Sequence, residues 1–472
     1  MPSTGAERPN ILWIFIEDQD PRYSCYGEPL VNTPHIDALA EQGVLFERAY
    51  APCPVCSPSR SAILTGSYQI RNGTHVQRSS RFPGEEIYLP EGTKTVPELF
   101  RDAGYFTYNR GKDDYNFAYD REKLYSTGNA GIEDLGKMKG VQAGGGDWSE
   151  CPPDMPFFAQ MQTNGGKNGY TLEQVTKVLQ KLEVNNPQLV DPADVTVPPQ
   201  YPDIPEMRER IANQLNTMLV TDIEVRNMVA RLKEDGHWGN TIIFLISDHG
   251  ALFPRAKQMC YEEGVHIPLI VAAPGMADLV SVIPAGVRRT EQTALLDVAA
   301  TSLVLAGIPI PDYMDSVNLF GESSRRNHIF AARDRCEWTV DRVRSVIGER
   351  YHYIKNFMTD RPLAQPSFRD GWPEIVRAKE MYERGELTPA QALPYGPRPA
   401  EELYDLQEDP HELVNLADDP DHQEILRELR RLVEDWIEDT DDKGQYPESK
   451  AALQILKKMF PEQAVDPVFE GL

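Results

Sequence analysis

The chain contains two continuous apolar runs, and a pair of ionisable residues closely follows each of them. Ile11–Ile16 leads directly into Glu17–Asp18, and Thr241–Ile246 leads, after one serine, into Asp248–His249. A strand that is apolar at every position is buried on both faces, as in a parallel sheet covered by helices. The two runs therefore predict two central strands with acidic and imidazole side chains just beyond their ends.

A third run, His266–Ala272, repeats the strand pattern, and helical periodicity separates the runs, for example at residues 34–42 and 211–235. Alternating strands and helices predict an α/β fold with a mostly parallel sheet. Ligands of such folds bind beyond the carboxyl ends of the strands. We therefore expect the polar pairs at 17–18 and 248–249 to lie at the binding edge of the sheet.

The pattern changes later in the chain. Residues 115–205 are rich in Gly, Pro and Asn, and we interpret them as long loops over one rim of the sheet. Short alternating runs after residue 327 predict an antiparallel sheet. This division predicts a larger α/β unit over 1–326 and a smaller α+β unit over 327–472. A helix is expected over 421–439, with one apolar face formed by Ile425, Leu429, Leu432, Trp436 and Ile437.

Composition excludes several classes of protein. The 472 residues are 40% hydrophobic and 26% charged, as in ordinary globular proteins, and the net charge of −25 argues against nucleic acid or anionic membranes as partners. No run approaches the about 20 apolar residues of a membrane-spanning helix, and the N-terminal residues lack a secretory pattern. The six cysteines form neither a disulfide framework nor a zinc pattern, so a cytoplasmic protein is expected.

The most informative motif surrounds Cys56. Residues 54–66 read Pro-Val-Cys-Ser-Pro-Ser-Arg-Ser-Ala-Ile-Leu-Thr-Gly, which places Arg60 one helical turn after the cysteine. A lone cysteine is more often a small buried apolar residue than a reactive one. Cys53, which lacks Pro and Arg at these offsets, is interpreted in that way. The string around Cys56 resembles the sulfatase signature at every position.

The resemblance to sulfatases covers nearly the whole chain. Residues 9–18, 32–37, 43–46, 247–250, 261–264, 267–270, 402–405 and 409–416 resemble family strings in the family order. It implies an alkaline-phosphatase-like fold with a smaller C-terminal subdomain. Residues 330–334 and 351–357 resemble the heparan N-sulfatase-like branch of the family.

In the family, a separate enzyme oxidises the signature cysteine to formylglycine, so the resemblance implies this modification at Cys56. The hydrate of the aldehyde carries two hydroxyl groups. One attacks sulfur, and the other expels sulfate as the aldehyde forms again. A serine in this position would stay sulfated. Arg60 can hold the hydrate and the ester oxygens.

Charge predicts a metal site. Carboxylates gathered at one edge of a sheet repel each other unless a cation neutralises them, so Glu17, Asp18, Asp248 and His249 are expected to share one divalent ion. Oxygen ligands favour Ca²⁺ or Mg²⁺. The family usually has Asp at the position of Glu17 and commonly Asn at that of His249. These departures could admit Mn²⁺.

Basic residues are expected to neutralise the sulfate. Lys112 and Lys257 match the two lysines of the family, and the resemblance makes both site residues. Residues 156–158 fit the strand that leads to a family histidine, but that position holds Asn164, with Lys167 shortly after it. We interpret Asn164 and Lys167 as substrate-binding residues.

Two family histidines are absent, and one of them ordinarily protonates the departing alcohol. Asp114 stands where one of them is expected. A general acid contributes about 10²–10⁴-fold to a rate. His75, His266 and a protonated Asp114 are the candidate replacements, although each histidine alone is more often structural.

The resemblance implies hydrolysis of a sulfate ester, or a sulfamate, to an alcohol or amine and inorganic sulfate. Two alternatives stay open. Related enzymes use the same formylglycine to cleave phosphonate monoesters or phosphodiesters, and a weakly catalytic protein could bind sulfated glycans. The intact motif at Cys56 argues against the second. Expected partners are a small-molecule or saccharide sulfate ester and the formylglycine-generating enzyme, and a homo-oligomer is left open.

Overall fold

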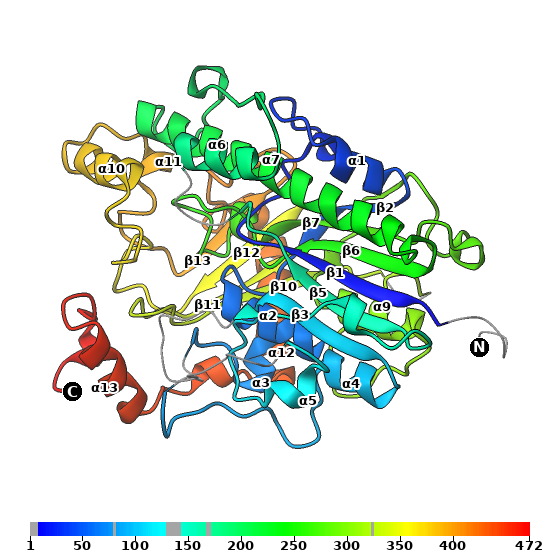
Figure 1. The fold of residues 1–472 in the computed structure, drawn as a ribbon. Coiled ribbons are helices and arrows are strands. Elements are labelled where there is room, and N and C mark those ends of the chain that lie inside the picture. Colours follow the sequence, from blue (N-terminus) through cyan, green and yellow to red (C-terminus); the bar gives the residue numbers. More distant parts are fainter. Residues whose placement is uncertain (1–7, 79–81, 129–142, 167–170, 322–324) are drawn as a thin grey trace.

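The computed structural model describes residues 8–78, 82–128, 143–166, 171–321 and 325–472. In these residues, nine strands form a large sheet in the order β4-β3-β5-β1-β6-β7-β2-β8, with β9 pairing with β2 (Figure 1). The strands are β1 (Asn10–Ile16), β2 (Gly43–Tyr50), β3 (Phe106–Lys112), β4 (Ala143–Gly144), β5 (Phe157–Gln162), β6 (Thr241–Ser247), β7 (His266–Ala272), β8 (Val287–Arg289) and β9 (Thr293–Ala294).

The predicted parallel core of the sheet is confirmed, with one correction. Strands β3, β5, β1 and β6 run parallel, and Ile16 lies opposite Ser247 at the ends of β1 and β6. Strand β7, however, pairs antiparallel with both β6 and β2. Residues 248–265 connect β6 to β7 and contain one single-turn helix, α8 (Glu262–Val265), whereas parallel neighbours are usually joined by a full crossover helix. The apolar run His266–Ala272 indicates that the strand is buried, but it does not indicate the direction of the strand.

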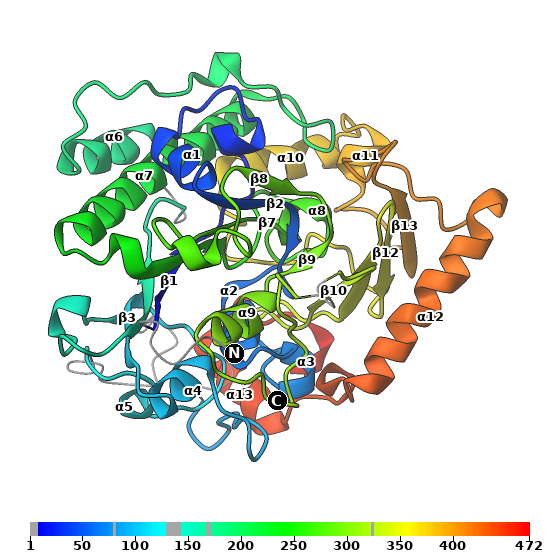
Figure 2. The ribbon, with the colours of Figure 1, turned by 90° about the vertical axis from the view of Figure 1, so that its right-hand side faces the viewer.

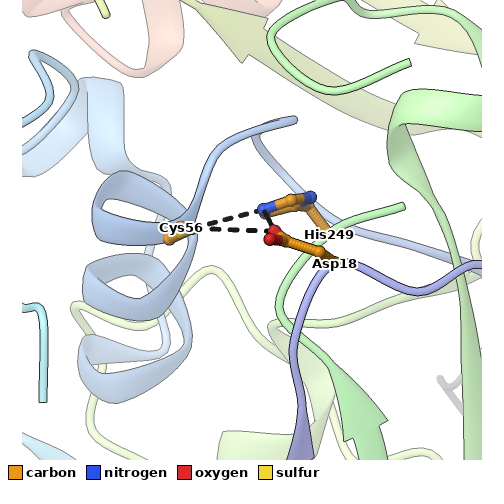
Figure 3. A group of neighbouring side chains, drawn as sticks. All are labelled: Asp18, Cys56 and His249. Atoms are coloured by element: carbon orange, nitrogen blue, oxygen red, sulfur yellow. Dashed lines mark hydrogen bonds and ion pairs between the residues drawn. The ribbon is translucent and has the colours of Figure 1, made fainter. Parts of the chain in front are cut away.

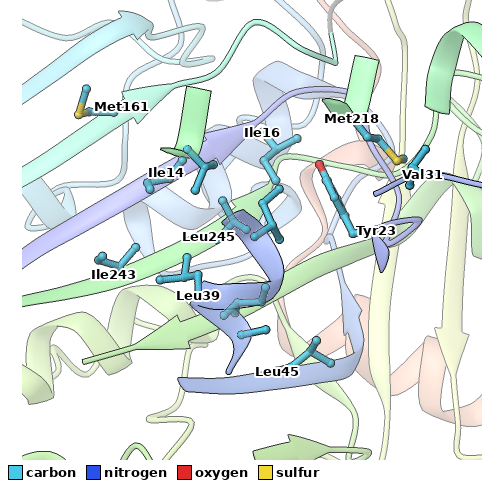
Figure 4. Close-up of a cluster of buried hydrophobic side chains, with 14 of the residues drawn as sticks. Ile14, Ile16, Tyr23, Val31, Leu39, Leu45, Met161, Met218, Ile243 and Leu245 are labelled. Carbon is cyan, nitrogen blue, oxygen red and sulfur yellow. The ribbon is translucent and has the colours of Figure 1, made fainter. Parts of the chain in front are cut away.

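Helices cover both faces of the large sheet (Figure 1). The side chains of β1 alternate between two cores. Leu12 and Ile14 pack with Ile211 of α7, whereas Trp13 packs with Leu303 of α9 on the other face. Figure 4 shows part of the first core. The helices of this part are α1 (Pro34–Ala40), α2 (Cys56–Thr65), α3 (Gln69–Asn72), α4 (Val96–Asp102), α5 (Arg121–Leu124), α6 (Leu172–Lys181), α7 (Pro205–Glu234) and α9 (Asp297–Leu305).

The interpretation of residues 115–205 as loops is wrong in part. Strand β5 lies in this segment and pairs with both β1 and β3 near the centre of the sheet. The segment also contains helix α6. The short run Phe157–Met161 is fully buried, and the surrounding Gly, Pro and Asn residues masked it in the composition of the whole segment.

A second, antiparallel sheet follows in the C-terminal part, as predicted. Its strands, in spatial order, are β10 (Ile329–Arg333), β11 (Val343–Ile347), β12 (Tyr351–Asn356) and β13 (Glu401–Asp405). The other C-terminal helices are α10 (Pro373–Glu383), α11 (Pro389–Ala392), α12 (Gln423–Asp439) and α13 (Lys450–Met459). Figure 2 shows α12 along the outer side of this sheet. The unit boundary at 326/327 falls between the two sheets and stays a prediction.

Helix α12 buries a face slightly rotated from the expected one. Its buried side chains are Leu426, Leu429, Val433 and Trp436. Ile425, Leu432 and Ile437 pack at the edges of this face and are partly buried. None of the helices in the described ranges has the length and apolar character needed to cross a membrane.

Candidate active site

The predicted polar pairs meet at one edge of the large sheet. Because β1 and β6 are parallel neighbours, Glu17–Asp18 and Asp248–His249 leave the sheet side by side. The backbone N–H of Asp18 donates to Asp248 Oδ1 at 3.4 Å, and Asp18 Oδ1 lies 2.8 Å from His249 Nε2. All four residues are buried. The tertiary structure thus brings the four predicted metal ligands together.

Cys56 begins helix α2 and faces this edge of the sheet (Figure 3). Its Sγ lies 3.3 Å from His249 Nε2, 3.5 Å from Lys257 Nζ and 4.0 Å from Asp18 Oδ1. Burial would raise the pKa of the Cys56 thiol, but Lys112 and Lys257 outweigh it and lower this pKa below its ordinary value. The surroundings of Cys56 therefore stabilise negative charge, and so does its place at the amino end of a helix.

Arg60 lies one turn further along α2 and binds three strand ends. Its guanidinium donates from Nε to Asp248 Oδ2 at 2.9 Å and from Nη1 to Gln162 Oε1 at 2.8 Å, and its Nη2 lies 3.4 Å from Glu17 Oε1. Its side chain is only 1% exposed. Burial would lower the pKa of Arg60, but Asp248 and Glu17 raise it, so the guanidinium is permanently charged.

Lys112 and Lys257 reach the edge of the sheet from two different segments, the end of β3 and the connection between β6 and β7. Lys112 ends β3, and its Nζ lies 3.3 Å from Glu17 Oε1 and 3.8 Å from Asp248 Oδ2. Lys257 Nζ donates to Asp18 Oδ1 at 2.7 Å. The structure therefore places both predicted lysines beside the carboxylates, with Lys257 also in contact with Cys56. Their positive charges offset part of the negative charge of the neighbouring carboxylates.

Among the described residues, the group that could hold a cation shares Asp18 and His249 with the predicted set and contains Cys56 in place of Glu17 and Asp248. Asp18, Cys56 and His249 present one ligand atom each, all within 4.8 Å of one another. Carboxylates suit Ca²⁺ or Mg²⁺, and an imidazole also accepts Mn²⁺. Burial would lower the pKa of His249, but Asp248, Cys56 and Asp18 raise it to about 10. Binding through His249 would therefore release a proton.

Asp114 lies in the site and contacts Arg78, a residue that was not predicted. Its buried carboxylate lies 3.5 Å from Lys112 Nζ and 3.3 Å from Arg78 Nε. Arg78 in turn reaches Glu337, with 3.5 Å between Nη1 and Oε1. Neither Arg78 nor Glu337 belongs to a motif, and the sequence carries no signal that would have joined them.

The structure does not bring the two candidate histidines to Cys56. His75 is buried beside a separate cavity of about 420 Å³ that Asp334 and Tyr446 also line. His266 contacts the backbone oxygen of Glu47 at 2.8 Å, and its ring stacks on Tyr50. Both belong to other polar clusters, so their expected role as acids is not supported by their positions.

Asn164 lies beside the site and contacts Glu224. Its backbone N–H donates to Glu224 Oε2 at 2.7 Å, and its side-chain amide donates to Oε1 at 3.0 Å. Both residues line a cleft of about 520 Å³ that also reaches Glu17 and Lys112. This cleft is the opening beside the carboxylates. Lys167, the other predicted substrate-binding residue, lies outside the described residues.

Comparison with known proteins adds independent findings. The family model described as Sulfatase matches residues 9–308. The chain is 28% identical to an ulvan-active sulfatase of Formosa agariphila, over 98% of this chain and 79% of that protein. It is 26% identical to human N-sulphoglucosamine sulphohydrolase, over 92% of this chain and 90% of that protein. A solved structure with its substrate D-glucosamine-2-N,6-O-disulfate matches with a TM-score of 0.65 at 19% identity, covering 94% and 100% of the two chains, which shows a shared fold.

Proposed function

The chain belongs to the sulfatase family and is a sulfuric ester hydrolase, and we propose that it removes sulfate from a sulfated saccharide through a formylglycine made from Cys56. The relatives named above act on ulvan and on N-sulphoglucosamine, according to their names. A saccharide sulfate ester or sulfamate is therefore the substrate class that we propose for this chain.

One observation carries the proposal. Cys56 begins a helix and contacts Lys257 and His249 at the binding edge of the sheet. An inert structural cysteine needs neither cationic neighbours nor this position. The chemistry supplied by formylglycine is that of an aldehyde hydrate, which offers one hydroxyl group for attack on sulfur and a second for release of sulfate.

The cationic side chains have separate tasks in this proposal. Arg60 is fixed by three strand ends, so it presents its guanidinium without losing much conformational entropy. Lys112 and Lys257 are placed to balance the charge of the bound sulfate, which carries one negative charge as a monoester. These contacts orient the sulfur towards residue 56.

We also propose that Glu17, Asp18, Asp248 and His249 hold one divalent cation, with Ca²⁺ first and Mg²⁺ or Mn²⁺ as alternatives. When bound, the cation would neutralise the carboxylates and polarise an oxygen of the sulfate group. The convergence of three buried carboxylates and one imidazole supports this proposal.

The test combines a mass measurement with a substrate panel. In active protein, the tryptic peptide with residue 56 should weigh about 18 Da less than the cysteine form, because the thiol becomes an aldehyde. Cys56→Ser should lose several orders of magnitude of activity. The matched control, Cys53→Ser, changes a buried cysteine three residues away and should leave the mass shift at residue 56 intact.

The substrate panel would contain sulfated monosaccharides, glycosaminoglycan fragments, aryl sulfates, an aryl phosphonate and a phosphodiester. Hydrolysis of sulfates at the highest rate supports the proposal. Faster cleavage of the phosphonate or the diester would replace it by the alternative hydrolase. Binding of sulfated fragments with no turnover, together with an unmodified Cys56, would indicate a glycan-binding protein.

A further inference from the structure

Backbone strain is concentrated around the active site. Left-handed backbone is costly for residues other than glycine and gathers at functional sites, where the surrounding structure enforces it. Five of the nine non-glycine residues with positive φ in the described ranges lie at this site: Asp18, Arg78, Asp114, Gln258 and Glu337. Three of them form a chain of contacts, in which Arg78 touches both Asp114 and Glu337. We call these three the acid–arginine–acid set.

Arg78 is the centre of this set. Its Nε and Nη2 lie 3.3 and 3.5 Å from the two carboxylate oxygens of Asp114, and its Nη1 lies 3.5 Å from Glu337 Oε1. The guanidinium therefore holds two carboxyl groups at a fixed separation. Asp114 links the set to Lys112, which contacts Glu17.

Glu337 reaches the site from the second sheet. It lies in the loop between β10 and β11, and the preceding residue, Cys336, packs against Cys53 and Val55 just before the nucleophile position. The backbone N–H of Gln77 donates to the carbonyl oxygen of Arg335 at 3.1 Å, which fixes this loop beside Arg78. The loop is thus packed against Cys53 and Val55, which precede Cys56, and is bonded to Gln77.

The two carboxyl groups of the set have different environments. Asp114 is fully buried and contacts both Lys112 and Arg78. The Glu337 side chain is 17% exposed, and its Oε2 accepts no hydrogen bond from the described residues. Burial raises the pKa of Glu337, and Arg78 and Lys257 oppose this only in part. A carboxyl group that is mostly buried and has one direct cationic partner can keep its proton and act as an acid.

We propose that Glu337 is the general acid that protonates the leaving group, and that Arg78, held by Asp114, positions it. The inference rests on the proposed sulfatase function and supplies the acid that the missing family histidines would have provided. In this role Glu337 would be a catalytic residue, since the acid must contact the departing oxygen. Arg78 and Asp114 would be positioning residues.

The step balances without another reactant. As the bond from the nucleophile oxygen to sulfur forms, the bond from sulfur to the leaving oxygen breaks, and its electron pair stays on that oxygen. The oxygen takes the proton from the Glu337 carboxyl group. The resulting carboxylate is stabilised by Arg78 and regains a proton from water. For a sulfamate, the departing nitrogen takes the proton in the same way.

The test compares Glu337→Gln with the unmodified enzyme on substituted phenyl sulfates and one alkyl sulfate. The amide keeps the size and the contact with Arg78, but it cannot donate an acidic proton. Turnover should fall about 10²–10⁴-fold on the poorest leaving group and only a few-fold on 4-nitrophenyl sulfate, whose phenolate needs little protonation. The dependence on leaving-group pKa should become steeper.

The pH profile gives a second readout. The unmodified enzyme should lose activity on poor leaving groups as the pH rises through the pKa of Glu337, because the carboxyl group then loses its proton. This basic limb should disappear in Glu337→Gln. The control, Glu448→Gln, removes a carboxylate that contacts Arg335 in the same region and should leave both the limb and the leaving-group dependence unchanged.

Two results would overturn the inference. An equal loss on every leaving group in Glu337→Gln would indicate a structural role, and an unchanged leaving-group dependence would exclude an acid. If Glu337→Gln does not fold, Glu337→Asp, which withdraws the carboxyl group by one methylene, should show the same selective loss on poor leaving groups. If the unmodified enzyme cleaves no sulfate at all, the proposed function itself fails.

Discussion

Arg60 Nε lies 2.9 Å from Asp248 Oδ2, so a helix residue just after Cys56 is tied to the end of the central strand β6. The contact is buried on both sides, with exposed fractions of 1% and 0%. It sets the distance between the nucleophile position and the proposed cation ligands. The local order of the site therefore depends on one arginine that also contacts β1 and β5.

Replacing this arginine should affect rate and stability together. In Arg60→Lys, one ammonium cannot serve Asp248, Glu17 and Gln162 at once. Hydrogen bonds to charged groups contribute about 1.5–3 kcal/mol, so kcat/KM should fall roughly 10–150-fold, and the free energy of unfolding should fall by a similar energy. Steady-state kinetics and urea unfolding measure both. Arg71→Lys on the neighbouring helix, where the side chain is 31% exposed, should change kcat/KM little. Equal effects of the two variants would contradict the prediction.

Removal of divalent cations should lower turnover and the melting temperature together. A ligand at 100 times its Kd stabilises a protein by about 2.7 kcal/mol, and a chelator removes this stabilisation. Adding back Ca²⁺, Mg²⁺ or Mn²⁺ singly would identify the ion that restores both. In Asp18→Asn, the chelator should lower the melting temperature by less than it does in the unmodified protein. Full activity after exhaustive chelation, with no metal found by elemental analysis, would remove the site.

His75→Ala and His266→Ala should each change turnover by no more than a few-fold on poor leaving groups. The contacts of both histidines lie in other clusters, so neither is placed to protonate the departing group. The measurement is kcat/KM on an alkyl sulfate, normalised to folded protein. A loss of about 10²–10⁴-fold in either variant would make that histidine the acid and would displace Glu337.

Glu337 should also affect stability in a pH-dependent way. Its pKa in the folded state is raised, so between the ordinary glutamate pKa of about 4.3 and the folded value the folded state binds more protons than the unfolded state. The unmodified protein should therefore lose stability relative to Glu337→Gln as the pH rises through this window. Melting temperatures of the two proteins, measured in parallel across pH, give the difference. A constant difference would show that Glu337 titrates normally.

The second sheet contains a buried ion pair that should govern its stability. Arg344 donates from Nη2 to Asp442 Oδ1 at 2.7 Å, and both side chains are fully buried. Arg344→Met leaves Asp442 without this partner, and breaking a buried pair costs about 3–5 kcal/mol. Arg431→Met, at a residue 78% exposed, should stay within about 0.5 kcal/mol. Urea unfolding would compare them, and equal stabilities would contradict the prediction.

The central strands and their polar ends could be predicted because the information is local. Ile11–Ile16 is apolar throughout, and this pattern is stable only between two layers of helices. The direction of β7 could not be predicted from the pattern, and β5 was indicated by the resemblance at residues 156–158 but not by the composition of its segment. Strand direction depends on the connection, and a short run is hidden by the composition around it.

The sequence by itself determined the predicted nucleophile position at Cys56, the helix that follows it and the acids that follow two buried strands. Residues that follow parallel strands of one sheet lie at the same edge of that sheet, so local patterns were sufficient to predict that half of the site. Only the tertiary structure decided which groups stand near the place of the missing histidines. Arg78 and Glu337 are 259 residues apart, and they meet because the loop of the second sheet packs beside Cys53 and Val55. No periodicity or spacing in the sequence predicts this contact, because it arises from packing between the two sheets.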